Sequence, residues 1–222
     1  MFNERFVGQD LSQLVWAVAR IAPSSSATDM TNGGHGCSDK FRTSLAHFAA
    51  WAESQSVKQN FAKLKSKEFT PLVWALAKLL PFSKDLRQQA LGAPAPFWSA
   101  VSQRIMFLSQ HNDHENISAR GRAGLATFSK AEITTLAHSI ATASCSSEVD
   151  LLTDSVPQDL SVVLDLTSAQ RSVRALVDCY LNPKPPLPQF GGRGSSPTRS
   201  QFNEAKDLSM ICWSCASVRI AS

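Results

Sequence analysis

The chain has 222 residues, 43% of them hydrophobic, and a formal net charge of +4 from 22 Lys and Arg against 18 Asp and Glu. That length can bury a sizeable core, and the mild positive charge is compatible with a nucleic-acid partner without requiring one. Five cysteines, an odd number, argue against a disulfide-stapled secreted domain. The sequence has no run of 18 apolar residues, so we expect no membrane-spanning helix.

Apolar residues recur at intervals of three and four along most of the chain, which predicts amphipathic helices. The predicted helices cover residues 8–21, 41–60, 67–80, a segment introduced by Pro94 and Pro96 that continues to about 108, 129–143, a segment from 158 or 167 to 181, and 204–219. A short separate helix is expected at 82–91, and polar insertions near 23–40, 111–126 and 182–201. We therefore predict one all-α domain, residues 1–222, with about seven main helices.

Four of these helices repeat one pattern, FVGQDLSQLVWAVARI from residue 6, LKSKEFTPLVWALAKL from 64, FSKAEITTLAHSIATA from 128 and FNEAKDLSMICWSCASV from 202. Their alignment gives a first stripe at Leu11/Phe69/Ile133/Leu208, Leu14/Leu72/Leu136/Ile211, Val15/Val73/Ala137/Cys212 and Val18/Leu76/Ile140/Cys215. A second stripe, roughly 120° away, contains Ser12/Thr70/Thr134/Ser209, Trp16/Trp74/His138/Trp213 and Ala19/Ala77/Ala141/Ala216. We expect each helix to be buried on both stripes, with the Trp residues inside the stack.

The beginning of the third copy carries capping signals. Ser129 and Glu132 have the spacing of a capping box, and Phe128 and Ile133 that of a hydrophobic staple. Acidic residues also stand near the positive end of the helix dipole in the first two copies, at Asp10 and Glu68. The sequence therefore indicates where these helices begin.

This pattern resembles the octotricopeptide repeat, a helical hairpin whose second helix carries phrases such as DLSQLVWAVARI, FTPLVWALAKL and DLSMICWSCASV. The segment PAPFWSAVSQRI, from Pro94 to Ile105, is similar to the other half of that hairpin. The resemblance implies an α-solenoid of about 3.5 stacked hairpins, beginning with the second helix of a hairpin. The chain departs from the family in two ways: His138 replaces the Trp, and the copies are 58, 64 and 75 residues apart (16 to 74, 74 to 138, 138 to 213), so each interval carries an insertion.

The resemblance further implies RNA binding, because octotricopeptide proteins are organellar RNA-binding factors. Basic residues supply candidate contacts, since cationic side chains bind phosphate. They occur on the exposed side of the repeat helices, in a basic stretch after the second predicted helix, on other helices and in the insertions. The candidates are Arg20, Lys58, Lys63, Lys65, Lys67, Lys78, Arg104, Arg120, Arg122, Arg171, Arg174 and Arg193.

Signals for chemistry are weak. The chain has no GxSxG, no phosphate-binding Gly-rich loop followed by Lys-Ser/Thr and no HExxH, so we expect no enzyme activity and no cofactor. Cys212 and Cys215 form a CxxC, but no second pair completes a zinc site, and both occupy repeat-core positions where we expect burial. The pairs His35/Cys37 and His111/His114 lie in polar loops, and we expect no metal there.

The number of units shapes the predicted role. If each unit recognises on the order of one base, four units distinguish only about 256 sequences, too few to single out one transcript. We therefore expect a structural rRNA-binding component of the mitochondrial ribosome, held among neighbouring ribonucleoprotein proteins, with no small-molecule substrate. An organellar mRNA maturation, stability or translation factor and a protein scaffold without RNA contact remain alternatives, as does the chloroplast. The first residues, MFNERF, do not resemble a targeting peptide.

Overall fold

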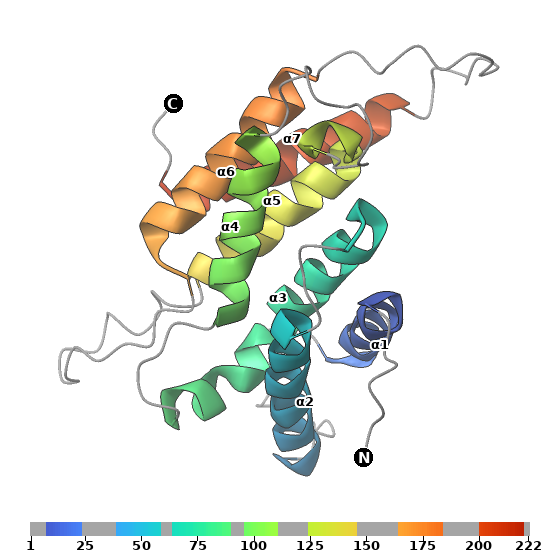
Figure 1. Cartoon of the computed structure of the whole chain (residues 1–222), viewed down its shortest axis with the longest axis vertical. Helices are drawn as coiled ribbons and strands as arrows, with labels where there is room; N and C mark the ends of the chain where they lie inside the picture. The colour runs from blue at the N-terminus through green and yellow to red at the C-terminus, as the bar shows by residue number, and fades with distance from the viewer. Residues whose placement is uncertain are drawn as a thin grey trace, which may run out of the picture.

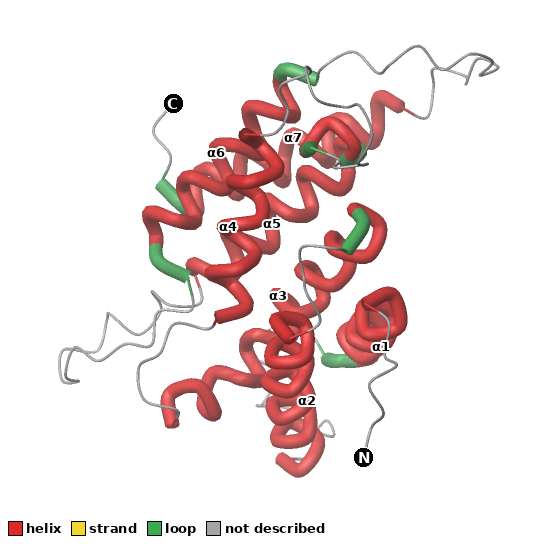
Figure 2. Tube along the Cα trace, viewed as in Figure 1, coloured by secondary structure: helices red, strands yellow, loops and turns green. Residues whose placement is uncertain are grey.

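The computed structural model describes residues 8–23, 39–58, 64–89, 96–110, 124–145, 164–183 and 200–219. Within these ranges the chain is all-α, as predicted, and contains no strand (Figures 1 and 2). The helices are α1 (Gly8–Ile21), α2 (Asp39–Lys58), α3 (Ser66–Gln89), α4 (Pro96–Gln110), α5 (Lys130–Cys145), α6 (Leu166–Leu181) and α7 (Ser200–Ser217), with a short 3₁₀ helix, η4 (Leu125–Thr127).

The helix α3 is longer than its sequence suggests. We expected it to end at residue 80, before Pro81, and a separate helix to follow at 82–91, but one helix continues to Gln89. Proline removes one backbone donor from a helix interior, yet Leu79 and Leu80 before it and Ser83 after it are all buried. The packing thus continues across Pro81, and the Ser83 hydroxyl donates to the carbonyl oxygen of Leu80 at 3.1 Å.

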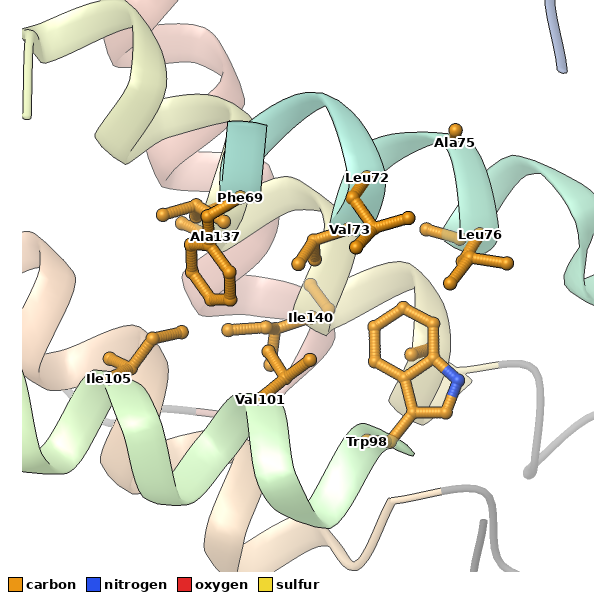
Figure 3. Close-up of a cluster of buried hydrophobic side chains, with 14 of the residues drawn as sticks. Phe69, Leu72, Val73, Ala75, Leu76, Trp98, Val101, Ile105, Ala137 and Ile140 are labelled. Atoms are coloured by element: carbon orange, nitrogen blue, oxygen red, sulfur yellow. The ribbon is translucent and has the colours of Figure 1, made fainter. Parts of the chain in front are cut away.

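The helices form two rows. The odd row consists of α1, α3, α5 and α7, each packed on the next, and the even row consists of α2, α4 and α6, also packed in succession. Between the rows, α2 contacts α1 and α3, while α6 contacts α5 and α7 (Figure 1). Large side chains of α4, namely Trp98, Val101 and Ile105, extend toward α3 and α5 and fill the core there (Figure 3).

The expected burial on two stripes holds for the middle of the odd row and is wrong for its ends. In α3 and α5 both stripes are buried except at the ring positions, where Trp74 and His138 are half-buried. At the two ends, α1 exposes Leu14 and α7 exposes Leu208, which is 46% accessible. The physical reason is that α1 packs only on α3 within the odd row, and α7 only on α5.

One hydrogen-bonding position recurs between neighbours in the odd row. The Ser12 hydroxyl of α1 donates to the carbonyl oxygen of Glu68 in α3 at 2.7 Å. The equivalent hydroxyl of Thr134 in α5 donates to Oδ1 of Asp207 in α7 at 3.2 Å. Asp207 and Glu68 are themselves equivalent in the alignment, so the α1–α3 and α5–α7 contacts share one register.

The capping box at the start of α5 is confirmed. The backbone N–H of Ser129 donates to Glu132 Oε2 at 2.8 Å, and the backbone N–H of Glu132 donates to Ser129 Oγ at 3.2 Å. At the start of α3 a related contact forms, because the backbone N–H of Lys65 donates to Glu68 Oε2 at 3.0 Å. Both acids also lie near the positive ends of their helix dipoles.

Two equivalent leucines provide a matched test of this packing. Leu72→Ala in α3 removes a fully buried side chain and should lower the free energy of unfolding by about 2–5 kcal/mol. Leu14→Ala makes the same change in α1, where the leucine is 37% accessible, and should cost less than about half as much. Urea denaturation in dilute solution measures both. Equal losses would show that Leu14 is covered.

Candidate functional site

Each helix of the odd row has four equivalent positions, on the side opposite its core residues, that are not buried. We call these positions together the outer face: Gln9, Gln13, Trp16 and Arg20 in α1; Lys67, Pro71, Trp74 and Lys78 in α3; Ala131, Thr135, His138 and Thr142 in α5; Lys206, Met210, Trp213 and Ser217 in α7. Each is exposed or half-buried. None of these residues is acidic, four are basic, and four carry an aromatic or imidazole ring. The outer face is therefore cationic and ring-bearing.

On α1 and α3 a cation lies beside each tryptophan. The guanidinium carbon of Arg20 is 5.3 Å from the ring centroid of Trp16, and Nζ of Lys78 is 5.8 Å from that of Trp74. Both distances fall within the range of cation–π attraction, and the spacing of four residues puts ring and cation on one helix face. Each pair thus offers a flat apolar ring and a positive charge at one place.

On α5 and α7 the outer face carries rings without an adjacent cation at the fourth residue. His138 and Trp213 lie against each other across the two helices, with ring centroids 4.6 Å apart and planes inclined by 49°. Burial lowers the pKa of His138 below its ordinary value of about 6.5, and its Nδ1 is buried without a partner among the described residues. The imidazole is therefore neutral at neutral pH.

The expectation that the repeat tryptophans lie inside the stack is wrong for Trp16 and Trp213 and holds in part for Trp74, which packs against the core. Trp16 is 43% accessible and Trp213 44%, while Trp74 is half-buried. Small residues such as Ser12 and Ala19 let neighbouring odd helices approach closely, which leaves no room for an indole between them. The rings therefore lie at the edge of each contact, on the outer face.

The basic residues predicted from the sequence separate into groups. Arg20, Lys67 and Lys78 all lie on the outer face, and so does Lys206, which was not among the predicted contacts. The alignment of the four helices could have indicated Lys206, because Lys206 occupies the position equivalent to Lys67. The remaining described candidates are exposed elsewhere: Lys58 at the end of α2, Lys65 just before α3, and Arg171 and Arg174 on α6. Lys63, Arg120, Arg122 and Arg193 lie outside the described residues.

Arg104 must be removed from the candidates. Its Nη2 donates to the carbonyl oxygen of Leu64, and its guanidinium carbon lies 4.4 Å from the ring centroid of Phe69. Burial lowers the pKa of Arg104 to about 10, an effect partly offset by the nearby negative charge of Glu68. Arg104 therefore connects α4 to the start of α3 and belongs to the fold.

The cysteines of the CxxC also differ from expectation. Cys212 is exposed, so its predicted burial is wrong; Cys215 is half-buried, and burial together with the nearby Cys212 raises its pKa. Both follow from the one-sided packing of α7. In the described part of the chain no three His, Cys, Asp or Glu side chains gather as a metal-binding group. The loop residues His35, Cys37, His111 and His114 lie outside that part.

No protein-family model, no curated protein and no solved structure matches the chain. Among the described helices, none has the length and continuous hydrophobicity needed to span a bilayer.

The depressed pKa of His138 predicts a pH effect. Because its folded pKa lies below its unfolded value of about 6.5, the unfolded chain binds the proton first, and stability falls as pH drops below about 6.5. His138→Phe keeps a ring but cannot ionise, so its melting temperature should fall less between pH 7.5 and 5.5 than that of the wild type. His47→Phe, at an exposed site on α2, is the control. Identical pH dependence in wild type and His138→Phe would refute this assignment.

Proposed function

We propose that the chain is a non-catalytic RNA-binding protein, an α-solenoid of about 3.5 octotricopeptide-like repeats. The observation that carries this proposal is the outer face, on which rings and cations recur without a carboxylate at the positions that define it. Proteins that hold single-stranded nucleic acid combine aromatic platforms, on which bases stack, with cations that follow the phosphates. The pairs Trp16/Arg20 and Trp74/Lys78 supply both components.

The solenoid part of the proposal is supported by the order of the contacts. The odd helices pack in succession, the even helices form a second row, and each odd helix except α1 follows an even helix in sequence. Ser12 and Thr134, at equivalent positions, make equivalent contacts to the next odd helix. Repeat proteins whose units contact mainly their neighbours have this arrangement.

The chemistry of the outer face indicates how RNA is held. Exposed Trp16 and Trp213 offer ring faces to unpaired bases, and stacking accepts any base because every base has a π-face. Arg20, Lys67, Lys78 and Lys206 neutralise phosphates. Such a surface binds by shape and charge rather than by a base-specific code.

This mode of binding fits a structural role better than selection of one transcript. Four units with sequence-tolerant contacts suit a protein that clamps an rRNA segment within a ribonucleoprotein, and we propose the mitochondrial ribosome as that particle. An organellar mRNA factor, in mitochondrion or chloroplast, and a scaffold that binds protein alone are the outcomes that the experiments below separate.

The RNA-binding face can be located by removing the same number of charges from two places. Arg20→Ala with Lys78→Ala removes two cations from the outer face, while Arg171→Ala with Arg174→Ala removes two from α6. Fluorescence anisotropy with a labelled single-stranded RNA, measured over a salt series, should show the slope of log affinity against log salt reduced by about 1.4 for the first variant alone. A reduced slope for the α6 variant alone would move the contact surface to the even row.

Trp16→Ala extends the same experiment to stacking. Removing a ring that stacks on a base should weaken binding by about 1–3 kcal/mol while the salt slope stays the same. Affinity unchanged in both this variant and the outer-face charge variant would place the RNA contact away from the outer face, and a wild type that binds no RNA would favour the protein scaffold.

Sedimentation tests the ribosomal role. In a gradient of organelle lysate the protein should migrate with a ribosomal subunit and remain there at moderate salt, because it is held by many neighbours. Detection by immunoblot, with and without nuclease, separates the outcomes. Migration with a smaller particle that nuclease releases supports the mRNA factor, and a free position in the gradient contradicts both ribonucleoprotein roles.

A further inference from the structure

The first helix of the odd row exposes a surface that its equivalents bury. In α1 this surface consists of Leu14, Ala17 and Ile21, which we call the leading face. The equivalent residues are Leu72, Ala75 and Leu79 in α3, Leu136, Ser139 and Ala143 in α5, and Ile211, Ser214 and Val218 in α7, all of them buried. Ile21 is 72% accessible, whereas Leu79 is fully buried. The α1 leading face is thus exposed at Ala17 and Ile21 and partly covered at Leu14, which is 37% accessible.

The last helix of the odd row exposes the complementary surface. In α7 this surface consists of Leu208, Cys212 and Ala216, which we call the trailing face. The equivalent residues are Leu11, Val15 and Ala19 in α1, Phe69, Val73 and Ala77 in α3, and Ile133, Ala137 and Ala141 in α5, and all nine are buried. The α7 trailing face therefore lacks a covering that the other three helices have.

These two surfaces are the two halves of one interface that the molecule already uses. Within the odd row α1 packs only on α3 and buries its trailing face, while α7 packs only on α5 and buries its leading face. The hydrogen bonds agree: the hydroxyl of Ser12, beside the trailing face of α1, reaches the backbone of Glu68, beside the leading face of α3. Between α5 and α7 the equivalent hydroxyl of Thr134 donates to the side-chain Oδ1 of Asp207, the residue equivalent to Glu68.

We propose that the chain associates head to tail with a second copy of itself, the trailing face of α7 packing on the leading face of α1 of the next copy. A second copy fits these faces because each exposed face has the residue positions that meet in the α1–α3 and α5–α7 contacts. In the joined chains Ser209 of α7 would lie opposite Asp10 of α1, the equivalents of Thr134 and Asp207. Both residues are exposed in the single chain.

This interface is heterologous, because two different surfaces meet: one copy keeps its leading face free and the other keeps its trailing face free. Such contacts propagate into open chains unless the rotation between copies closes a ring. The inference does not depend on RNA binding, although association would align the outer faces of successive copies and lengthen the surface available to RNA.

Two single-face variants and their mixture test the proposal. Purified, nuclease-treated full chain, studied by light scattering and sedimentation velocity over a concentration series, should show a mass that rises above one copy as concentration increases. Ile21→Glu places a charge on the leading face and Leu208→Glu one on the trailing face. Each variant alone should remain a single copy, because every contact joins one leading face to one trailing face, and one of these two faces carries the charge in every copy.

An equal mixture of the two variants distinguishes this interface from others. The α7 of the Ile21→Glu copy and the α1 of the Leu208→Glu copy are both intact, so the mixture should reach twice the mass of one copy and stop there. Gln13→Glu, which adds a charge to the outer face of α1, should associate as the wild type does. Circular dichroism spectra matching that of the wild type will establish that the variants are folded.

Three results would overturn the proposal. A wild type that stays a single copy at the highest concentration means that the end faces are covered by something other than this chain. Association abolished by Ile21→Glu but retained by Leu208→Glu alone means a symmetric α1–α1 contact. Association that persists in both variants places the contact elsewhere.

Discussion

The close approach of neighbouring odd-row helices is the constraint on which the rest of the structure depends. Ser12 and Ala19 in α1, and the equivalent small residues in α3 and α5, are buried at these contacts, and small side chains permit close backbone approach. Because neighbouring odd helices pack closely, each of the middle helices α3 and α5 has an odd-row neighbour on two sides and the even row on a third. The core then consists of the side chains that these helices direct toward one another, including Trp98 and Ile105 of α4 (Figure 3).

The outer face follows from the same constraint. A helix surrounded on three sides keeps one exposed stripe, and the 3.6-residue period aligns that stripe along the row. An indole that does not fit between close helices is displaced to the edge of the contact, where one side of its ring packs and the other meets solvent. Trp74, which is half-buried, and Trp16, which is exposed, differ in how much of the indole lies outside the contact. A surface suited to stacking thus results from packing geometry combined with the recurrence of tryptophan.

Local features of the structure were predictable from the sequence, and features set by neighbours were not. The all-α class, the bounds of α1, the end of α6 and the Ser129/Glu132 capping box depend on periodicity and short-range hydrogen bonds, and the structure confirms them. The start of α6, which the sequence left open between 158 and 167, lies at Leu166. The exposure of Leu208 could not be predicted, because the repeat pattern gives every copy the same two stripes whether or not a neighbour exists. The role of Arg104 was missed for a related reason, since its partner Leu64 lies 40 residues away and no local pattern connects them.

The charge of the outer face is distributed unevenly, so that its α1–α3 half differs from its α5–α7 half. The α1–α3 half pairs each tryptophan with a cation four residues later, whereas the α5–α7 half has the hydroxyls of Thr142 and Ser217 there and directs the ring of His138 onto Trp213. Salt screens exposed cations but has little effect on ring stacking. In the proposed RNA-binding role, a bound strand would therefore be held electrostatically near α1 and mainly by stacking near α7, where Lys206 is the cation among the positions that define the outer face. In the proposed head-to-tail association, these two kinds of contact would alternate along the joined copies. An RNA longer than the outer face of one copy would then reach the cationic α1–α3 half of the next copy.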